Sequence, residues 1–315
     1  MEFAEALNAK QTIFSGLGLT YRRTRVDEPR VSVGISLPEQ SPRAFRVAIR
    51  ARSHEDLELA RSHGRLGVLE RYPESALDIQ ITGPIVATPV GGQASTQKRL
   101  SIGASVGHYL CSAGSIGFFA RRDADGAIGL VSNNHVLAAC DEGEEYDDVL
   151  HPAPADNGRR ESDVVGHLAG GYPRLDADAP TVDCAFARLR DGVQYDASTI
   201  GPDLRLQGGL VPLESQREVF KKGRSTGLTR GRITAFAIDH CDVQLDVGIV
   251  IFDQQIEIAS TDAGPFSRPG DSGSLVVNPD GHAVGLLAAG TFDCRLHYAN
   301  PIGEVLRSLA VTLLT

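Results

Sequence analysis

The chain has 315 residues, of which 42% are hydrophobic and 23% are charged, the composition of a soluble globular protein. Its 31 basic and 40 acidic side chains give a net charge of −9 at pH 7, which argues against general nucleic-acid binding because that function needs a basic surface. No segment approaches the ~20 consecutive apolar residues of a membrane-spanning helix, so we expect neither nucleic acid nor a membrane as a partner.

Residues 1–95 are predicted to form a small α/β module. Helices are expected at 1–12 and at 53–64, where Ser53 is a suitable N-cap. The segment 88–97, TPVGGQASTQ, is predicted to be a linker to a second domain because of its Pro, Gly, Ser and Thr content. Strands are expected where apolar and polar residues alternate, at 30–37, 44–51 and 76–83.

Residues 96–315 have a different pattern, in which short apolar or alternating runs are separated by turn residues. This pattern is typical of an all-β sandwich or barrel. A helix is expected at 301–314, where apolar residues recur at helical spacing. The predicted strands lie at 115–122, 127–134, 182–189, 231–238, 243–252, 255–260, 274–278 and 283–290.

The five cysteines are predicted to be free thiols. Their number is odd, and no two have the C-x-x-C spacing of a redox or metal motif. Residues 1–18 carry acidic side chains and lack the apolar core of a signal peptide, so we expect a cytoplasmic protein. The sequence has no H-E-x-x-H and no paired His or Cys at ligand spacing, and we therefore expect no metal and no cofactor.

The stretch RPGDSGSLVV, residues 268–277, places a serine between two glycines, ahead of an apolar strand. Such a turn lets the backbone approach a ligand, and Ser272 is a candidate nucleophile that needs a base. His135 is the best candidate base, because NNHVLA sets it at a corner between a strand and a short helix. Asp183, which enters an apolar strand, is the candidate acid that orients the imidazole, since a half-buried carboxylate needs a partner.

Other interpretations of these residues stay open. Asp176 and Asp178 in PRLDADAP are second choices for the acid, and Asp163 at the start of DVVGHL is the third. A purely structural alternative is that the two glycines only shape a turn and that the histidine only caps a helix.

Three motifs in chain order, NNHVLA, VDCAFARL and PGDSGSLVV, resemble those of the trypsin-like serine proteases. The segments SIGFFARRDADGAIGLVSNNHVLA and KKGRSTGLTRGRITA are similar to a bacterial and plant subgroup of intracellular trypsin-like peptidases that includes the narrow-leaf-type proteins. The resemblance covers roughly residues 100–310. It implies a mainly β fold, a chymotrypsin-like double β-barrel with the small α/β module before it and a helix at its C-terminal end.

The resemblance implies a role for each matching residue. Ser272 would attack a peptide carbonyl, His135 would take and return the proton, and Asp183 would hold the imidazole. The backbone N–H groups of Gly270 and Ser272 would form the oxyanion hole. Asp271 is expected to pair with an internal Arg or Lys, since intracellular relatives lack the cleaved N-terminus that pairs with this residue in secreted ones.

The resemblance also places a substrate-binding strand at AVGLLAAG, residues 283–290. Ala288, Ala289 and Gly290 would lie beside bound substrate, although many relatives have a serine at the first of these positions that helps to hold the acid. Phe266 would form the floor of the specificity pocket, where a phenyl ring favours a small or apolar residue. The alternative is that Phe266 belongs to the core.

The sequence therefore predicts a serine endopeptidase that cleaves protein or peptide substrates through an acyl-enzyme. The module at 1–95 is expected to restrain the protease or to recruit a partner, and a regulatory protein and self-association are left open. A catalytically silent binding or scaffold protein is the main alternative. A non-peptidase acyl hydrolase is disfavoured, because G-x-S-x-G is missing. GRSTGLTRG, residues 223–231, lacks the Gly-Lys-Ser/Thr of a phosphate loop and is predicted to be a turn that enters a strand.

Overall fold

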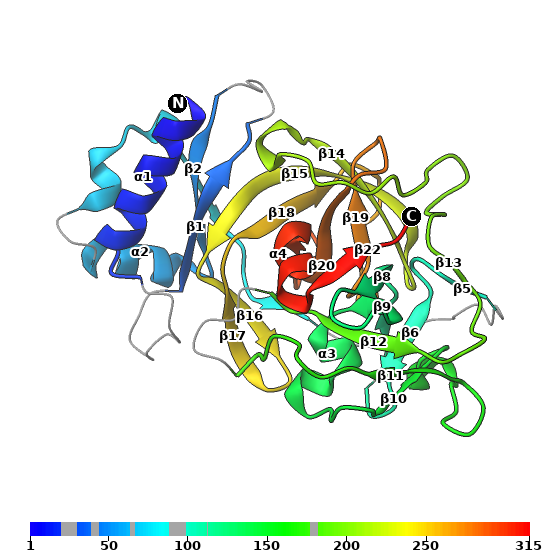
Figure 1. The fold of residues 1–315 in the computed structure, drawn as a ribbon. Helices are drawn as coiled ribbons and strands as arrows, with labels where there is room; N and C mark the ends of the chain where they lie inside the picture. Colours follow the sequence, from blue (N-terminus) through cyan, green and yellow to red (C-terminus); the bar gives the residue numbers. More distant parts are fainter. Residues whose placement is uncertain (20–29, 39–43, 64–66, 88–98, 112, 177–181) are drawn as a thin grey trace.

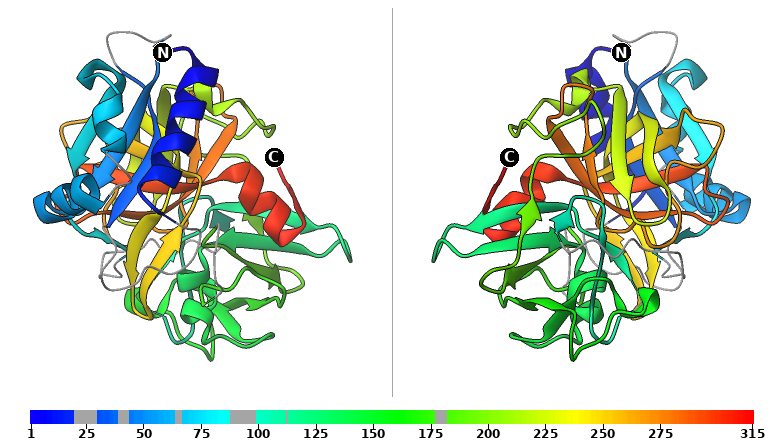
Figure 2. Two further views of the ribbon diagram at one scale, coloured as in Figure 1. Left: turned by 90° about the vertical axis from the view of Figure 1, so that its left-hand side faces the viewer. Right: turned by 90° about the vertical axis from the view of Figure 1, so that its right-hand side faces the viewer.

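The computed structural model describes residues 1–19, 30–38, 44–63, 67–87, 99–111, 113–176 and 182–315. Most of the described secondary structure is β, in one large sheet, one medium sheet and one short strand pair. In Figures 1 and 2 the green strands of the first barrel lie below the yellow and orange strands of the second. The predicted fold class, a chymotrypsin-like double β-barrel, is confirmed by this arrangement.

The first barrel is an eight-stranded half-barrel in the order β22-β8-β9-β12-β11-β10-β6-β7. Its neighbouring strands pair antiparallel throughout, as alternating sequences joined by short turns favour. Its strands are β6 (Ser105–His108), β7 (Gly114–Ser115), β8 (Phe118–Arg122), β9 (Ile128–Ser132), β10 (Asp148–Leu150), β11 (Val164–Leu168), β12 (Ala185–Leu189) and β22 (Val311–Leu313). The short helix α3 (Asn134–Leu137) follows β9, and β5 (Leu100–Ser101) pairs with β13 (Tyr195–Asp196) outside this sheet.

The second barrel is a closed ring within a twelve-stranded sheet. The ring runs β14-β15-β18-β21-β20-β19 and back to β14. These strands are β14 (Glu218–Gly223), β15 (Gly227–Asp239), β18 (Gln255–Ser260), β19 (Leu275–Val277), β20 (Ala283–Thr291) and β21 (Leu296–Pro301). A branch beyond β20 consists of β4 (Ile85–Val86), β16 (Cys241–Leu245) and β17 (Gly248–Phe252).

The N-terminal module has the predicted elements. They are α1 (Phe3–Gly16), β1 (Val31–Ser36), β2 (Arg46–Ala51), α2 (His54–His63) and β3 (Leu77–Ile81). Ser53 caps α2 as expected, since its Oγ accepts the N–H of Asp56 at 3.0 Å. Short 3₁₀ helices lie at Val68–Arg71, Glu74–Ala76, Ala139–Asp141, Pro154–Asp156 and Leu213–Ser215.

This module shares its sheet with the second barrel, because β1 pairs with β15. The guanidinium of Arg50, on β2, is buried and bonds both carboxylate oxygens of Glu257, on β18, at 2.7 and 2.8 Å. Lys10 on α1 pairs with Asp239 on β15 at 2.6 Å, and both side chains are buried. The predicted linker at 88–97 lies outside the described residues. Buried charge pairs and a continuous sheet therefore connect residues 1–87 to the barrel.

Two predicted elements have different bounds in the structure. The run 243–252 is divided between β16 and β17, which form a hairpin that turns at Asp246 and Val247. The expected helix at 301–314 ends early: α4 (Ile302–Leu309) stops where Ala310 takes a left-handed conformation with φ of 48°. The apolar residues after it form β22, which pairs antiparallel with β8 and satisfies backbone groups along the free side of that strand.

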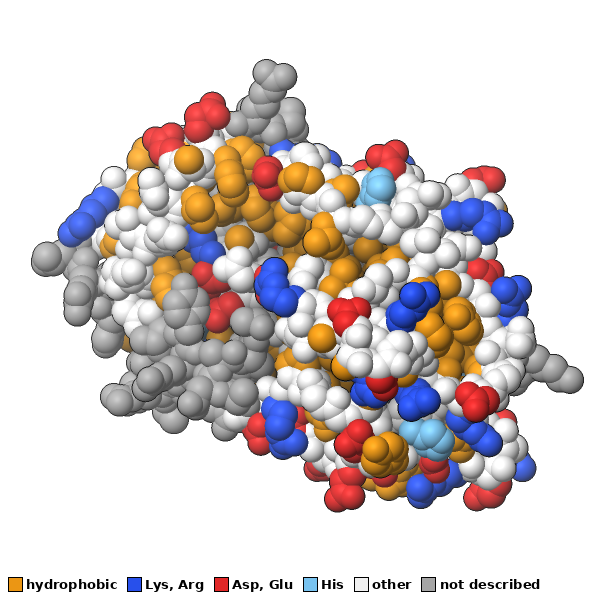
Figure 3. Space-filling model, in the orientation of Figure 1, with side chains coloured by type: hydrophobic (Ala, Val, Ile, Leu, Met, Phe, Trp, Pro, Cys, Tyr) orange, Lys and Arg blue, Asp and Glu red, His pale blue; other side chains and the backbone are white. Residues whose placement is uncertain are grey.

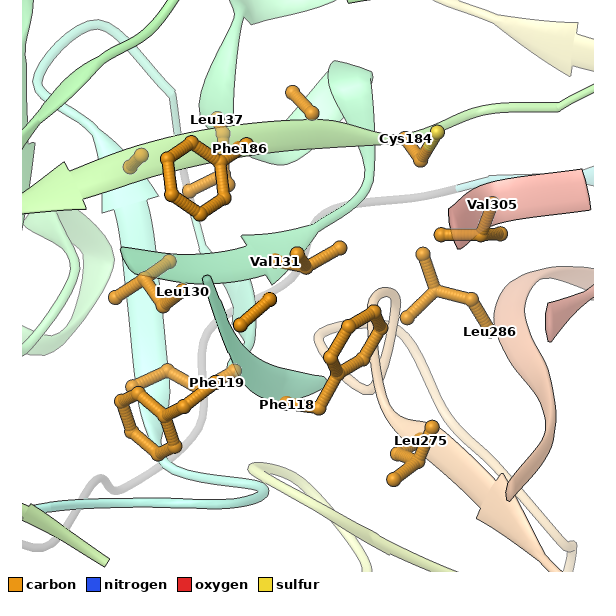
Figure 4. Packing of buried hydrophobic residues seen from close by; sticks show 14 of the residues in the cluster. Phe118, Phe119, Leu130, Val131, Leu137, Cys184, Phe186, Leu275, Leu286 and Val305 are labelled. Carbon is orange, nitrogen blue, oxygen red and sulfur yellow. The ribbon is translucent and has the colours of Figure 1, made fainter. Parts of the chain in front are cut away.

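The largest apolar cluster joins the two barrels. Figure 4 shows Leu275 and Leu286 of the second barrel beside Phe118 of the first, with Val305 of α4 next to them. All four side chains are fully buried. This packing joins the two barrels through one shared apolar core.

On the face shown in Figure 3, acidic and basic side chains are interspersed and form no single charged patch. This face therefore offers no extended basic surface. Among the described helices, none combines the length and apolarity that crossing a membrane requires.

Candidate active site

The turn with Ser272 needs both of its flanking glycines. Gly270 and Gly273 have φ of 95° and 87°, values that L-residues with a side chain rarely adopt. A Cβ on Gly273 would overlap Ser132 Oγ, and one on Gly270 would overlap the side chains of Arg224 and Ser225. The close approach of backbone and neighbours explains why GDSG has glycines at these positions.

His135 lies on α3, at the corner after β9, and its imidazole contacts Asp183. His135 Nδ1 is 2.5 Å from Asp183 Oδ2, and the backbone N–H of His135 donates to Asp183 Oδ1 at 3.2 Å. The carboxylate is 1% exposed, so it needs these donors. We assign the proton to Nδ1, because a carboxylate can only accept, and this leaves Nε2 as the basic nitrogen.

Two asparagines that the sequence analysis missed hold the backbone of Asp183. Asn133 Nδ2 donates to the carbonyl of Asp183 at 2.7 Å. Asn300, on β21, donates to the same carbonyl at 3.2 Å and accepts the N–H of Asp183 at 3.2 Å. Both amides are fully buried, and Asn300 comes from the second barrel, so they fix the acid across the cleft where Ala288 has no hydroxyl to do so.

The other candidate acids lie elsewhere. Asp176 is exposed and pairs with Arg174 at 3.1 Å. Asp163 accepts the N–H of Arg159 at 2.7 Å in an exposed turn. Asp178 lies outside the described residues. Among the candidates that the structure describes, Asp183 is the one beside His135.

Ser272 lies between two cavities on the floor of the cleft. One, of about 320 Å³, is lined by both Ser272 and His135. The other, of about 240 Å³, is lined by Ser272 together with Ala289 and Gly290. The Ser272 hydroxyl bonds the carbonyl of Ala288 at 3.5 Å and is not bonded to the imidazole. Such a bond is often absent without substrate and forms in the complex.

The turn also orients two backbone donors. Ser225 Oγ donates to Pro269 O at 2.7 Å, and Ser274 Oγ donates to Asp271 O at 2.6 Å. Because a trans peptide points its N–H away from its C=O, the N–H groups of Gly270 and Ser272 point away from these serines. In the described part of the chain neither N–H has an acceptor, as an oxyanion hole requires.

Asp271 forms the internal ion pair that the sequence predicted. Its carboxylate is fully buried and lies 3.4 Å from Lys221 Nζ. It also accepts the N–H groups of Ser225 at 2.7 Å and Thr226 at 3.2 Å. These residues belong to the turn at 223–231, which enters β15 as predicted, and the turn therefore holds the GDSG segment from behind.

The smaller cavity differs from the predicted pocket in its floor. Phe266 is fully buried behind it and packs on His297, with ring centroids 5.7 Å apart. The lining contains Ser267 and His297 instead, whose Oγ and Nδ1 are 2.7 Å apart. Burial lowers the pKa of His297 to about 4, so its imidazole is neutral at pH 7. Ala288 lies beside the Ser272 hydroxyl rather than in this cavity.

No group of three or more His, Cys, Asp or Glu side chains in the described ranges is arranged to hold a metal ion. The five cysteines all belong to the described residues, and none of them is in a disulfide.

The chain is similar to several known proteins. A model of the family "Nal1 C-terminal domain" matches residues 202–295. Protein NARROW LEAF 1 of Oryza sativa subsp. japonica is 29% identical over 201 residues, which cover 54% of this chain. The matched part spans only a third of that protein's length, 33%.

Solved structures of proteases also resemble the chain. Thermobifida fusca Protease A is 18% identical with a TM-score of 0.49. The match covers 69% of this chain and 99% of the chain of that protease. A chymotrypsin of Cellulomonas bogoriensis is 21% identical with a TM-score of 0.46. That match covers 69% of this chain and 99% of the chymotrypsin chain. The double-barrel assignment itself stands on the strand pairing described above.

Proposed function

We propose that the chain is a serine peptidase in which Ser272, His135 and Asp183 form the catalytic triad. The observation that carries this proposal is the buried pair of Asp183 and His135, in one cleft with a serine on a GDSG turn. The three lie far apart in the sequence, His135 on α3, Asp183 shortly before β12 and Ser272 shortly before β19. The order of the His, Asp and Ser motifs, which resembles that of trypsin-like serine proteases, supports the same proposal. We extend the proposal to a cytoplasmic peptidase that acts on peptides or proteins.

The proposed reaction follows from the proton positions. Ser272 Oγ attacks the peptide carbonyl carbon while His135 Nε2 takes the hydroxyl proton, and the carbonyl electrons move to its oxygen. The C–N bond then breaks, and Nε2 gives the proton to the leaving amine. A water molecule repeats the sequence on the acyl-enzyme and releases Ser272. Asp183 keeps the ring oriented and stabilises its charged form.

The donors on Gly270 and Ser272 would stabilise the oxyanion. Loss of one such donor typically costs about 100- to 1,000-fold in rate. Because the hydroxyls of Ser225 and Ser274 hold the carbonyls of the two flanking peptides, the donors are oriented before substrate binds. The side chain of the substrate residue whose carbonyl is attacked would enter the smaller cavity, where Leu287 and Ala289 favour a small or apolar side chain.

Labelling with an alkyl fluorophosphonate tests the proposal. The wild-type chain should be modified once, at Ser272, by intact mass and peptide mapping. Ser272→Ala should abolish labelling, whereas Ser215→Ala, which removes an exposed hydroxyl that lines neither cavity, should not change it. Equal labelling of the Ser272→Ala protein would contradict the assignment.

A catalytically silent binding protein of the same fold is the second candidate. It is favoured by the hydroxyl of Ser272, which bonds Ala288 and not the imidazole. A folded wild-type chain that resists the fluorophosphonate would support this candidate instead.

A further inference from the structure

The edge of β20 beside Ser272 is almost completely occupied. β21 pairs with one edge of β20 over residues 285–290, so β19 and β4 share the opposite edge. On that opposite edge the turn after Ser272 takes both backbone groups of Leu287, and β4 pairs Val86 with Gly290. In the described part of the chain, this leaves Ala288 without a strand partner along that edge, since Ala289 pairs with Tyr298 of β21.

An extended peptide usually binds by adding a strand to such an edge. The pairing of β20 with β21 shifts register between Leu287 and Ala289, and past this irregularity Ala288 and Gly290 both present backbone groups to the same edge as Leu287. The carbonyl of Ala288 lies beside the Ser272 hydroxyl and is open to a substrate N–H. The backbone N–H and C=O of Gly290, two residues or about 6.6 Å further along the strand, are already paired with Val86 of β4.

The strand that blocks this edge is built into the fold. β4 lies between β20 and β16, and Val86 also pairs with Gln244. Ile85 is 6% exposed and belongs to an apolar cluster with Val243 and Tyr298. Moving β4 away would expose Ile85 and break backbone pairing on both sides. Ala87, directly after it, lines the cavity that contains His135 and Ser272.

We propose that β4 closes the part of the substrate groove that holds residues on the amino-terminal side of the cleaved bond, so that only two such residues fit. The site would then take peptides whose cleaved bond lies within two residues of their amino end, so that the chain removes short N-terminal pieces. This inference rests on the proposed peptidase function and narrows the endopeptidase predicted from the sequence to an amino-end peptidase.

A length series of peptidyl diphenyl phosphonates tests the inference on the full chain. In these probes the serine oxygen displaces a phenoxide from phosphorus, so no later turnover is needed. All probes carry the alanine analogue next to phosphorus, and they have one, two or four residues in total. The two-residue probe should modify Ser272 about tenfold or more faster than the four-residue probe, since the longer one meets Val86.

One variant and one matched control sharpen the test. Ile85→Ala removes the side chain that anchors β4 and should raise the relative rate of the four-residue probe several-fold. Val250→Ala shortens a buried side chain of the same cluster on β17, which does not border β20, and should leave the rate ratio unchanged. An alkyl fluorophosphonate, which has no peptide part, should label all three proteins at the same rate.

Each outcome decides the matter. If the fluorophosphonate labels wild type and the four-residue probe reacts as fast as the two-residue probe, the inference alone is overturned. If the fluorophosphonate does not label Ser272, the proposed function fails and the inference with it. The wild-type series is sufficient even if Ile85→Ala does not fold.

Discussion

Lys221 Nζ lies 3.4 Å from Asp271 Oδ2, and both side chains are fully buried directly behind the candidate nucleophile. The ammonium also donates to Gly227 O at 3.1 Å and to the hydroxyl of Thr226. Burial lowers the pKa of Lys221, while the neighbouring carboxylate opposes that change. The pair connects β14 to the GDSG turn, and we expect it to hold Ser272 in position.

Lys221→Met should therefore destabilise the protein and disable the site. Removing one partner of a buried ion pair leaves an uncompensated charge and costs about 3–5 kcal/mol in unfolding free energy. Chemical denaturation and the rate of fluorophosphonate labelling measure the two effects. Lys222→Met on the same strand is the control, because Lys222 is only half-buried. A loss as small as that of the control would show that the pair does not hold the turn.

Asp183→Asn should lower kcat by about 10⁴ without unfolding the chain, because the amide favours the wrong imidazole tautomer. The measurement is peptide or chromogenic substrate turnover, with the melting transition as a check of folding. Asp176→Asn is the control, since that side chain is exposed. Activity that survives Asp183→Asn and is lost in Asp176→Asn would move the acid to the second position.

Arg50→Met should cost about 3–5 kcal/mol of unfolding free energy, because Glu257 would be left as a buried charge without its partner. Arg46→Met is the control: Arg46 lies on the same strand but is exposed. Urea denaturation of the two variants gives the comparison. Similar midpoints would argue that the module contributes little to the second barrel.

A fragment 99–315 should aggregate or lose its cooperative melting transition. It would lack β4 and the partner of Glu257, and it would leave an edge of β15 exposed. Calorimetry of the purified fragment tests this. A fragment that melts cooperatively would instead support the independent module predicted from the sequence.

Stability should fall on acidification partly because of His297. Its pKa of about 4 in the folded state lies below the ordinary value of 6.5, so the unfolded chain binds a proton first as the pH falls. The stability that His297 contributes is complete above pH 6.5 and is lost toward pH 4, by about 3 kcal/mol. His297→Gln should show a smaller drop between pH 7 and pH 4 in urea midpoints. His54→Gln, at an exposed position, should fall like wild type.

The cysteines should react in a defined order. Burial raises the pKa of Cys111 and of Cys140 to about 12, so both thiols should be nearly inert to iodoacetamide at pH 8. Cys294 is half-buried and should be alkylated first, as peptide mapping would reveal. All five should react after unfolding without reductant, by intact mass. Two or more thiols that stay blocked would reveal a disulfide.

The sequence alone was sufficient for what depends on neighbours along the chain. Alternation predicted β1, β2, β18 and β20, and Ser53 marked the start of α2, because strand pairing and capping leave local patterns. The glycines around Ser272 predicted the turn in the same way, because a backbone with positive φ favours glycine whatever the distant contacts are. Local patterns failed where the structure depends on a distant partner. The helix predicted at 301–314 ends at Leu309, and the residues after it form β22, which pairs with β8.

Only the tertiary structure decided which distant side chains meet. Asn300 holds Asp183 across 117 positions, and Arg50 holds Glu257 across 207. The most consequential case is β4, a two-residue strand that is too short to leave a pattern of its own and that the structure inserts between β16 and β20. Such contacts arise because closing the barrel buries backbone and charged groups that must then find partners, wherever in the sequence those partners lie.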